Sequence, residues 1–186
     1  GVDDALALSR GLNYRSVFSW TAIITACIEC GRYRDALSLH LCMLDDHVEP
    51  DSFTYVSLFQ ACGSLCDVEE GRKLHANACK KGYVSLSFIG NSLVTMYGKC
   101  GCVEEAENVF SGLVERNVVS WNAILAMYNE TDDVVKSLRL YRQMQEDGLV
   151  ATQATFVISL QMCGYLVERQ DHLIEEWNPR IIALDI

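Results

Sequence analysis

The sequence predicts an all-α protein, a right-handed α-solenoid of helix-turn-helix repeats, and three observations lead to this prediction. The first is an internal repeat: residues 19–24 are SWTAII and residues 120–125 are SWNAIL, an offset of 101. The second is an alternation of apolar and amphipathic segments. The third is the placement of helix-breaking residues between those segments. A fixed offset is typical of repeat proteins, in which stacked hairpins bury faces that one hairpin cannot bury alone.

The 101-residue offset divides into shorter units. Units that begin at residues 17, 52, 87, 118 and 153 have lengths of 35, 35, 31 and 35 residues. Each unit opens with an apolar, mostly aromatic segment, which predicts a first helix. An amphipathic segment with apolar residues at spacings of three and four follows, which predicts a second helix. These second segments are residues 33–44, 68–80, 103–113 and 134–145.

Helix stops stand between the segments. Glycine occupies positions 31, 82, 101 and 148, and glycine is the residue most favoured just beyond a helix C-terminus. Pro50 breaks the preceding helix, and Asp51 and Ser52 are suited to cap the next one. Each unit is therefore predicted to be a helix hairpin.

The composition is that of a folded chain with an uneven charge. Of the 186 residues, 50% are hydrophobic and 22% are charged, which is enough to bury a core. The net charge of −10 argues against a nonspecific basic nucleic-acid binder. The predicted first helices are neutral, however, because they contain no Asp, Glu, Lys or Arg in residues 17–28, 52–62, 87–98 and 118–129. The acidic excess lies in the second helices and turns.

The cysteine content and the longest uncharged run indicate whether the chain has disulfides or a membrane helix. Nine cysteines are too few for a disulfide scaffold, and reduced, packed thiols are the simplest interpretation. Residues 148–167 carry no charge and are long enough to span a bilayer. A unit boundary near Thr152 interrupts this run, so we expect no membrane helix. The chain begins at Gly1 instead of Met, which suggests a fragment.

The units resemble pentatricopeptide repeats of the plant type that alternates P, L and S repeats. The resemblance is based on the unit lengths, on residues such as Trp20 and Met43, on the Pro50-Asp51 boundary, and on the run NSLVTMYGKCG at residues 91–101. It implies a partial S-type repeat at 1–16, a P-type repeat at 17–51, an L-type repeat at 52–86, an S-type repeat at 87–117, a P-type repeat at 118–152, and a degenerate or truncated L-type repeat with a tail at 153–186.

The resemblance implies that the fifth and last residues of a unit recognise an RNA base. Helical repeats that bind single-stranded RNA present two or three side chains to each base. The pairs in this chain are Thr21 with Asp51, Asn91 with Asn117, and Asn122 with Thr152. The L-type unit has Val56 and Leu86 at these places, which offer no side-chain hydrogen bond. The last residues Asp51, Asn117 and Thr152 also precede helices, so they are equally candidates for N-caps, and the two roles are compatible.

Two further kinds of RNA contact are expected. The second residues of the units, Phe18, Phe53, Phe88 and Val119, are candidates for base stacking, although an aromatic residue at helical spacing is more often part of the core. Lys99 is a candidate for a phosphate contact, and a solvated turn lysine is the alternative.

The remaining motifs do not predict catalysis, a metal or a cofactor. Cys27 and Cys30 form a CxxC without the second pair that a zinc site needs. His47-Val48-Glu49 matches the HxE of zinc deaminases, but neither proline is followed by the cysteines of that chemistry. We therefore expect a protein that is not an enzyme.

The function implied by the resemblance is sequence-specific binding of single-stranded RNA in a mitochondrion or chloroplast. The process implied is editing, splicing or stabilisation of transcripts, with an RNA-processing enzyme or editing factor as a further partner. Neither a membrane nor a small-molecule substrate is expected. A protein-binding scaffold used like tetratricopeptide repeats is the alternative, and a fragment with too few units to bind RNA is another.

Overall fold

All of the secondary structure is helical in the part of the chain that the computed structural model describes, residues 16–131 and 133–168. The chain forms two compact units, residues 1–116 and 117–186. Residues 1–15 of the predicted partial repeat at 1–16, and residues 169–186 of the predicted final repeat and tail at 153–186, lie outside the described residues. No helix in the described ranges is long and apolar enough to cross a membrane.

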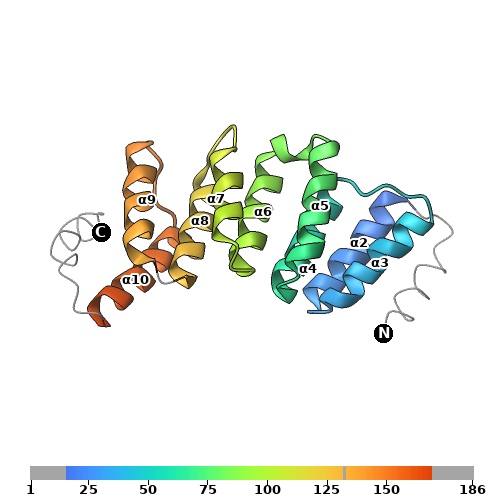
Figure 1. Ribbon diagram of the computed structural model, residues 1–186, viewed down its shortest axis with the longest axis horizontal. Coiled ribbons are helices and arrows are strands. Elements are labelled where there is room, and N and C mark those ends of the chain that lie inside the picture. Colours follow the sequence, from blue (N-terminus) through green and yellow to red (C-terminus); the bar gives the residue numbers. More distant parts are fainter. Residues whose placement is uncertain (1–15, 132, 169–186) are drawn as a thin grey trace. The chain divides into compact units, whose positions relative to one another are not determined.

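Residues 16–116 of the first unit form three helix hairpins (Figure 1). The elements in chain order are α2 (Val17–Glu29), α3 (Tyr33–Asp45), α4 (Ser52–Leu65), α5 (Val68–Lys80), the 3₁₀ helix η1 (Tyr83–Ser85), α6 (Ser87–Lys99) and α7 (Val103–Ser111).

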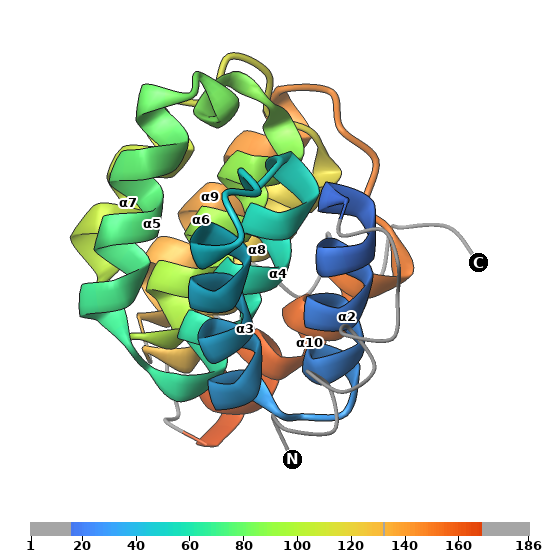
Figure 2. The same ribbon diagram turned by 90° about the vertical axis from the view of Figure 1, so that its right-hand side faces the viewer.

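These hairpins form two layers. The first helices α2, α4 and α6 pack side by side, and each also packs against the second helix of its own hairpin. In Figure 2 the second helices α3, α5 and α7 lie to the left of their partners. The layer of first helices is very close-packed at Gly63, where an added Cβ would lie 3.2 Å from the Cα of Met96.

The second unit repeats this arrangement with α8 (Val118–Glu130), α9 (Val134–Glu146) and α10 (Gln153–Glu168). Helix α10 packs against both α8 and α9. The Asn129 amide nitrogen donates a hydrogen bond to the Ile158 carbonyl oxygen at 2.9 Å, which ties the two first helices α8 and α10 together.

The helix boundaries follow the local signals in the sequence. The first helices begin at residues 17, 52, 87, 118 and 153, the predicted starts of the units. All four predicted glycine stops adopt the left-handed conformation that favours glycine, with φ between 70° and 76°. One second helix is shorter than predicted: α7 ends at Ser111 and not at residue 113, and Gly112 is its C-cap.

Both repeated tryptophans are buried, as their identical places in the repeat predict. Trp20 is 2% exposed and Trp121 is fully buried. In the second helices, the small and apolar residues Ala36, Leu39 and Met43 are also fully buried and lie on one face. The neutral first helices therefore make the core together with the apolar faces of the second helices, and most charged positions lie on the second helices and turns.

Candidate nucleic-acid interface

An exposed apolar side chain stands near the beginning of each of the first helices α2, α4, α6 and α8. The second residues of the units are exposed by 80% at Phe18, 65% at Phe53, 40% at Phe88 and 57% at Val119. Hence these side chains are not core residues, which was the alternative to a stacking role. Exposed apolar side chains that recur at one place of a fold mark an interaction surface.

The predicted base-contact residues inside the first helices lie on the same face of their own helix as its exposed second residue. Thr21, Asn91 and Asn122 each follow an exposed second-position residue by three positions, and residues three apart are neighbours on a helix surface. Thr21 and Asn122 are half-buried, and Asn91 is 8% exposed.

The first predicted pair is joined through a third residue. Asp51 is the N-cap of α4 and accepts a hydrogen bond from the backbone N–H of Thr54 at 2.8 Å. The Thr54 hydroxyl donates to the same carboxylate oxygen at 2.8 Å, and its oxygen lies 2.6 Å from the hydroxyl of Thr21. Thr21 and Asp51 are therefore held at one place by Thr54, although they lie in different helix hairpins.

The pair Asn122 and Thr152 has the same arrangement in the second unit. The Thr155 hydroxyl donates to the Asn122 side-chain oxygen at 2.8 Å and lies 3.0 Å from the Thr152 hydroxyl. The Asn122 amide nitrogen also donates directly to the Thr152 hydroxyl at 3.4 Å. Thr54 and Thr155 are 101 residues apart and both are fully buried.

The members of the pair Asn91 and Asn117 belong to different units of the structure. Asn117 is the N-cap of α8, and its side-chain oxygen accepts from the backbone N–H groups of Val119 and Ser120 at 3.0 and 3.1 Å. The Ser120 hydroxyl donates to the same oxygen at 3.3 Å. The Asn91 side-chain oxygen is buried and makes no hydrogen bond within the described residues.

The repeat at residues 52–86 has apolar residues at the fifth and last positions, and two aromatic rings stack beside them. Val56 is half-buried and Leu86 is 38% exposed. The rings of Phe53 and Phe88 stack with centroids 5.6 Å apart and planes at 16°. A planar base needs about 3.5 Å on each of its faces, so two rings that enclose one must lie about 7 Å apart. The Phe53–Phe88 gap is too narrow for a base.

The cation predicted to contact phosphate lies at the end of α6. Lys99 is exposed, and no ion pair to it occurs among residues 16–131 and 133–168. In contrast, Arg72 pairs with Glu69 and Glu105, Lys73 pairs with Glu70, and Lys81 pairs with Glu49. These ion pairs neutralise much of the positive charge of the first unit.

In the structure, His47 of the HxE motif lies in a turn, Glu49 forms an ion pair, and Cys62 is buried. His47 lies in a turn with φ of 58°, and Glu49 pairs with Lys81, which lowers the pKa of the Glu49 carboxyl. Burial raises the pKa of the Cys62 thiol to about 12, so this thiol is protonated at neutral pH. Within the described ranges, no three His, Cys, Asp or Glu residues come together as a metal site.

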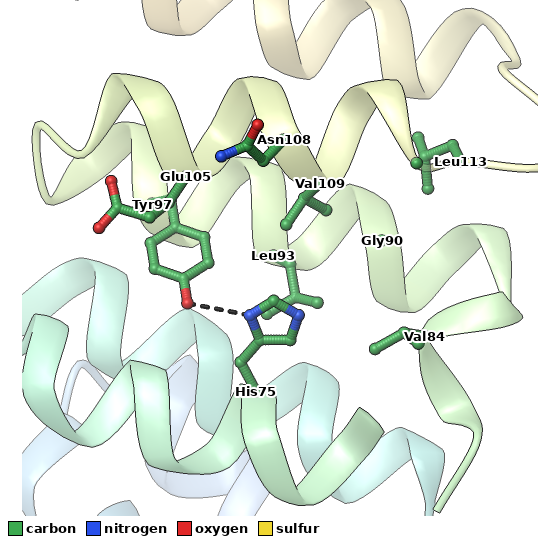
Figure 3. Close-up of a pocket in the computed structure, with 10 residues that line it drawn as sticks. His75, Val84, Gly90, Leu93, Tyr97, Glu105, Asn108, Val109 and Leu113 are labelled. Atoms are coloured by element: carbon green, nitrogen blue, oxygen red, sulfur yellow. Dashed lines mark hydrogen bonds between the residues drawn. The ribbon is translucent and has the colours of Figure 1, made fainter. Parts of the chain in front are cut away.

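A cavity of about 400 Å³ lies between α5, α6 and α7 (Figure 3). Val84, Leu93, Val109 and Leu113 supply its apolar wall. Its two central polar groups bind each other, because the His75 Nδ1 atom lies 3.0 Å from the Tyr97 hydroxyl. Burial lowers the pKa of His75 and raises the pKa of Tyr97 to about 12, so both are neutral at pH 7. None of the predicted base-contact residues lines this cavity.

Sequence reasoning assigned no role to Thr54 and Thr155. Their recurrence at the 101-residue offset is visible in the sequence, and it is the one signal that could have identified them. The sequence does not show that Thr54 contacts Thr21, or that Thr155 contacts Asn122, across neighbouring hairpins.

Helix hairpins that repeat in two layers, with the same joined polar groups near the starts of α2 and α8, define a helical-repeat protein. The PPR repeat family matches residues 15–64, and the PPR repeat matches residues 91–118 and 119–149. Together these matches cover more than half of the chain. The chain belongs to the pentatricopeptide repeat family.

Known relatives are longer proteins from Arabidopsis thaliana. One chloroplastic pentatricopeptide repeat-containing protein is 36% identical over 161 residues, which is 87% of this chain and 26% of the relative. The chloroplastic pentatricopeptide repeat-containing protein CRR2 is 34% identical over 178 residues, which is 94% of this chain and 27% of CRR2. The chain thus spans about a quarter of the length of these relatives.

Two solved structures have the same fold. The pentatricopeptide repeat protein PPR10 in complex with an 18-nt psaJ RNA element matches with a TM-score of 0.73 and 18% identity over 92% of this chain and 25% of that one. PPR10 from maize matches with a TM-score of 0.66 and 17% identity over 95% and 25% of the two chains.

Proposed function

We propose that this chain binds single-stranded RNA sequence-specifically, without catalysis of its own, as part of a longer protein. The observation that carries the proposal is the repeated joining of a fifth and a last residue: Thr21 with Asp51 through Thr54, and Asn122 with Thr152 through Thr155. A side chain reads a base edge only if its own orientation is fixed. Capping and base contact are therefore compatible roles for Asp51.

Three of the sequence repeats contact a base in this proposal, and the L-type repeat at residues 52–86 does not. Thr21 with Asp51, Asn91 with Asn117, and Asn122 with Thr152 are the base-contact pairs. Val56 and Leu86 have no group to donate or accept, and the stack of Phe53 on Phe88 occupies the place of a base in that unit. One nucleotide is thus spanned without being read between the first and second contacts, with RNA running parallel to the chain.

The exposed second residues supply stacking or apolar contact beside each base, and Lys99 supplies a phosphate contact. Stacking tolerates any base, because every base has a π face. These residues therefore contribute affinity, and the paired polar residues contribute sequence preference.

The process proposed is organellar RNA processing, in editing, splicing or transcript stability. Relatives are named chloroplastic, which supports a chloroplast or mitochondrion as the compartment. The P-, L- and S-type assignment of the units is part of the same proposal. An RNA-processing enzyme or editing factor, acting on the bound transcript, would supply any chemistry.

A gel shift with randomised single-stranded RNA tests the proposal. We expect binding to single strands, weaker binding to a duplex of the same length, and enrichment of a guanine followed two nucleotides later by a pyrimidine. A protein that binds no RNA in any pool, yet captures extended peptides, would instead be a scaffold of the tetratricopeptide kind.

Salt dependence is the first specific prediction. Each phosphate neutralised by Lys or Arg contributes to the slope of log K against log salt concentration. Four of the eight described Lys and Arg residues of the first unit are already in ion pairs, so we expect a slope magnitude of about 1–3. Affinity measured from low to moderate salt would give this slope. A value near that of strongly basic binders would contradict the neutral interface.

Removing the exposed ring of Phe18 is the second prediction. Phe18 is 80% exposed, so Phe18→Ala leaves the melting temperature nearly unchanged. RNA affinity falls by about 1 kcal/mol, the low end of base-aromatic stacking, because Phe18 covers one face of a base. Leu160→Ala on α10, which is 63% exposed and has no proposed RNA contact, is the control. Equal affinities for the two variants would remove Phe18 from the interface.

A further inference from the structure

We infer that Thr54 and Thr155 are positioning residues that determine which hydrogen-bonding groups the adjacent base-contact pairs present to RNA. This inference rests on the proposed function. It extends base preference to two buried residues that no base can touch, since Thr54 and Thr155 are both fully buried.

The Thr54 hydroxyl lies among three hydrogen-bonding neighbours, Asp51 Oδ1, the Asp51 backbone N–H and the Thr21 hydroxyl. A hydroxyl has one proton and two lone pairs, and an ionised carboxylate has no proton to donate. The Thr54 hydroxyl donates its single proton to Asp51 Oδ1 at 2.8 Å. It also accepts from the backbone N–H of Asp51 at 3.3 Å. The proton between the hydroxyls of Thr21 and Thr54, whose oxygens lie 2.6 Å apart, must therefore come from Thr21.

Thr21 and Asp51 keep only hydrogen-bond acceptors for a ligand. Thr21 has given its proton to Thr54 and presents only lone pairs. Asp51 uses Oδ1 for the cap, and no hydrogen bond within the described residues involves Oδ2. The pair therefore presents two acceptors. Guanine has two adjacent donors on its Watson–Crick edge, the ring N1–H and the N2 amino group, whereas adenine has a ring acceptor beside one amino group.

The same count at Thr155 gives a different outcome. Thr155 donates its proton to Asn122 Oδ1 at 2.8 Å and accepts from the Thr152 backbone N–H at 3.0 Å. Thr152 must then donate its hydroxyl proton to Thr155 across 3.0 Å. Asn122 uses one amide N–H on Thr152 and keeps the other. This pair presents an amide donor, although the buried residue is again threonine.

The hydroxyls of Thr54 and Thr155 make all the hydrogen bonds that a hydroxyl can make: each donates its proton and accepts with both lone pairs. Without the Thr54 hydroxyl, the Thr21 hydroxyl loses its acceptor and rotates freely. It can then donate to the ring nitrogen of adenine as readily as it accepts from guanine. Removing one buried hydroxyl should therefore weaken the discrimination between guanine and adenine while both base-contact side chains remain in place.

The test compares Thr54→Val, which keeps the shape and removes the hydroxyl, with Thr54→Ser, which keeps the hydroxyl. Binding is measured to four RNA oligonucleotides that differ only at the base opposite Thr21 and Asp51. The ratio of guanine to adenine affinity is expected to fall at least about fivefold in Thr54→Val, the lower limit for one lost base-specific contact. Thr54→Ser should restore the ratio.

The matched control is Thr25→Val. Thr25 and Ser57 form another hydroxyl pair between α2 and α4, with oxygens 2.9 Å apart, and neither belongs to a base-contact pair. Thr25→Val should leave the guanine to adenine ratio unchanged. Thr155→Val should change the base ranking opposite Asn122 and not that opposite Thr21. Melting curves establish that each variant is folded, and Thr54→Ala replaces Thr54→Val if the valine variant does not fold.

Two negative outcomes are distinguishable. A wild-type protein that prefers guanine and a folded Thr54→Val variant with the same ranking would overturn this inference alone. A wild-type protein that binds all four oligonucleotides equally would contradict the proposed function as well.

Discussion

Replacing Trp121 by Ala is expected to reduce the free energy of unfolding by about 3–5 kcal/mol, which is typical of large-to-small changes at buried aromatic residues. Trp121 is fully buried in α8, and Trp20 occupies the equivalent place in α2 with 2% exposure. Both indoles therefore fill space in the core. Because close-packed helices collapse only partly around a deleted side chain, most of the cavity would remain.

Urea denaturation of Trp20→Ala and Trp121→Ala, followed by far-ultraviolet circular dichroism, measures this loss. Phe18→Ala provides the matched comparison, since Phe18 lies on the same helix as Trp20 and is 80% exposed. It should unfold near the wild-type midpoint. A near-native midpoint for Trp20→Ala would mean that the hairpins do not pack in this register.

The starts of the helices were predictable because they depend on local signals. An apolar run, a capping side chain such as Asp51, and a glycine stop all lie within a few residues of the boundary they determine. The end of α7 was predicted two residues too late. Leu113 continues the apolar spacing, but Gly112 ends the helix, and Leu113 instead contributes to the wall of the cavity beside Gly90.

The candidate interface was predictable only in part. A fixed repeat register places Phe18 and Thr21 on one helix face, so their shared surface follows from the sequence. The link from Thr21 through Thr54 to Asp51 does not, because it depends on how closely α2 and α4 approach. Neither a distance of 2.6 Å between two hydroxyls nor the direction of their protons is encoded in a residue spacing.

Changing Asp51 to Asn is expected to move the base preferred at the first contact from guanine towards adenine. The amide introduced by Asp51→Asn would present an N–H where the carboxylate presents only acceptors, and adenine has a ring acceptor where guanine has a ring donor. The shift in relative affinity should be about 1–3 kcal/mol, the usual value of one base-specific contact. Stability should change little, because Asn and Asp are comparable N-caps.

Changing Thr21 to Asn should move the same preference towards uracil. The chain itself indicates that asparagine fits there, since Asn122 occupies the equivalent place 101 residues later and accepts a hydrogen bond from Thr155. Because Thr54 has already given its only proton to Asp51, the amide introduced by Thr21→Asn would donate one N–H to the Thr54 hydroxyl and would turn its second N–H outward in place of the hydroxyl lone pairs. Uracil combines a ring N–H for Asp51 with a carbonyl oxygen for this new donor.

Both switches are measured in one binding series, with each of the four bases at the first contact and with Asn122→Thr as the reciprocal change in the second unit. The wild-type ranking should change opposite the substituted pair and nowhere else. If neither Asp51→Asn nor Thr21→Asn alters the ranking of bases while the protein remains folded and binds RNA, these side chains act as helix caps and do not read the base.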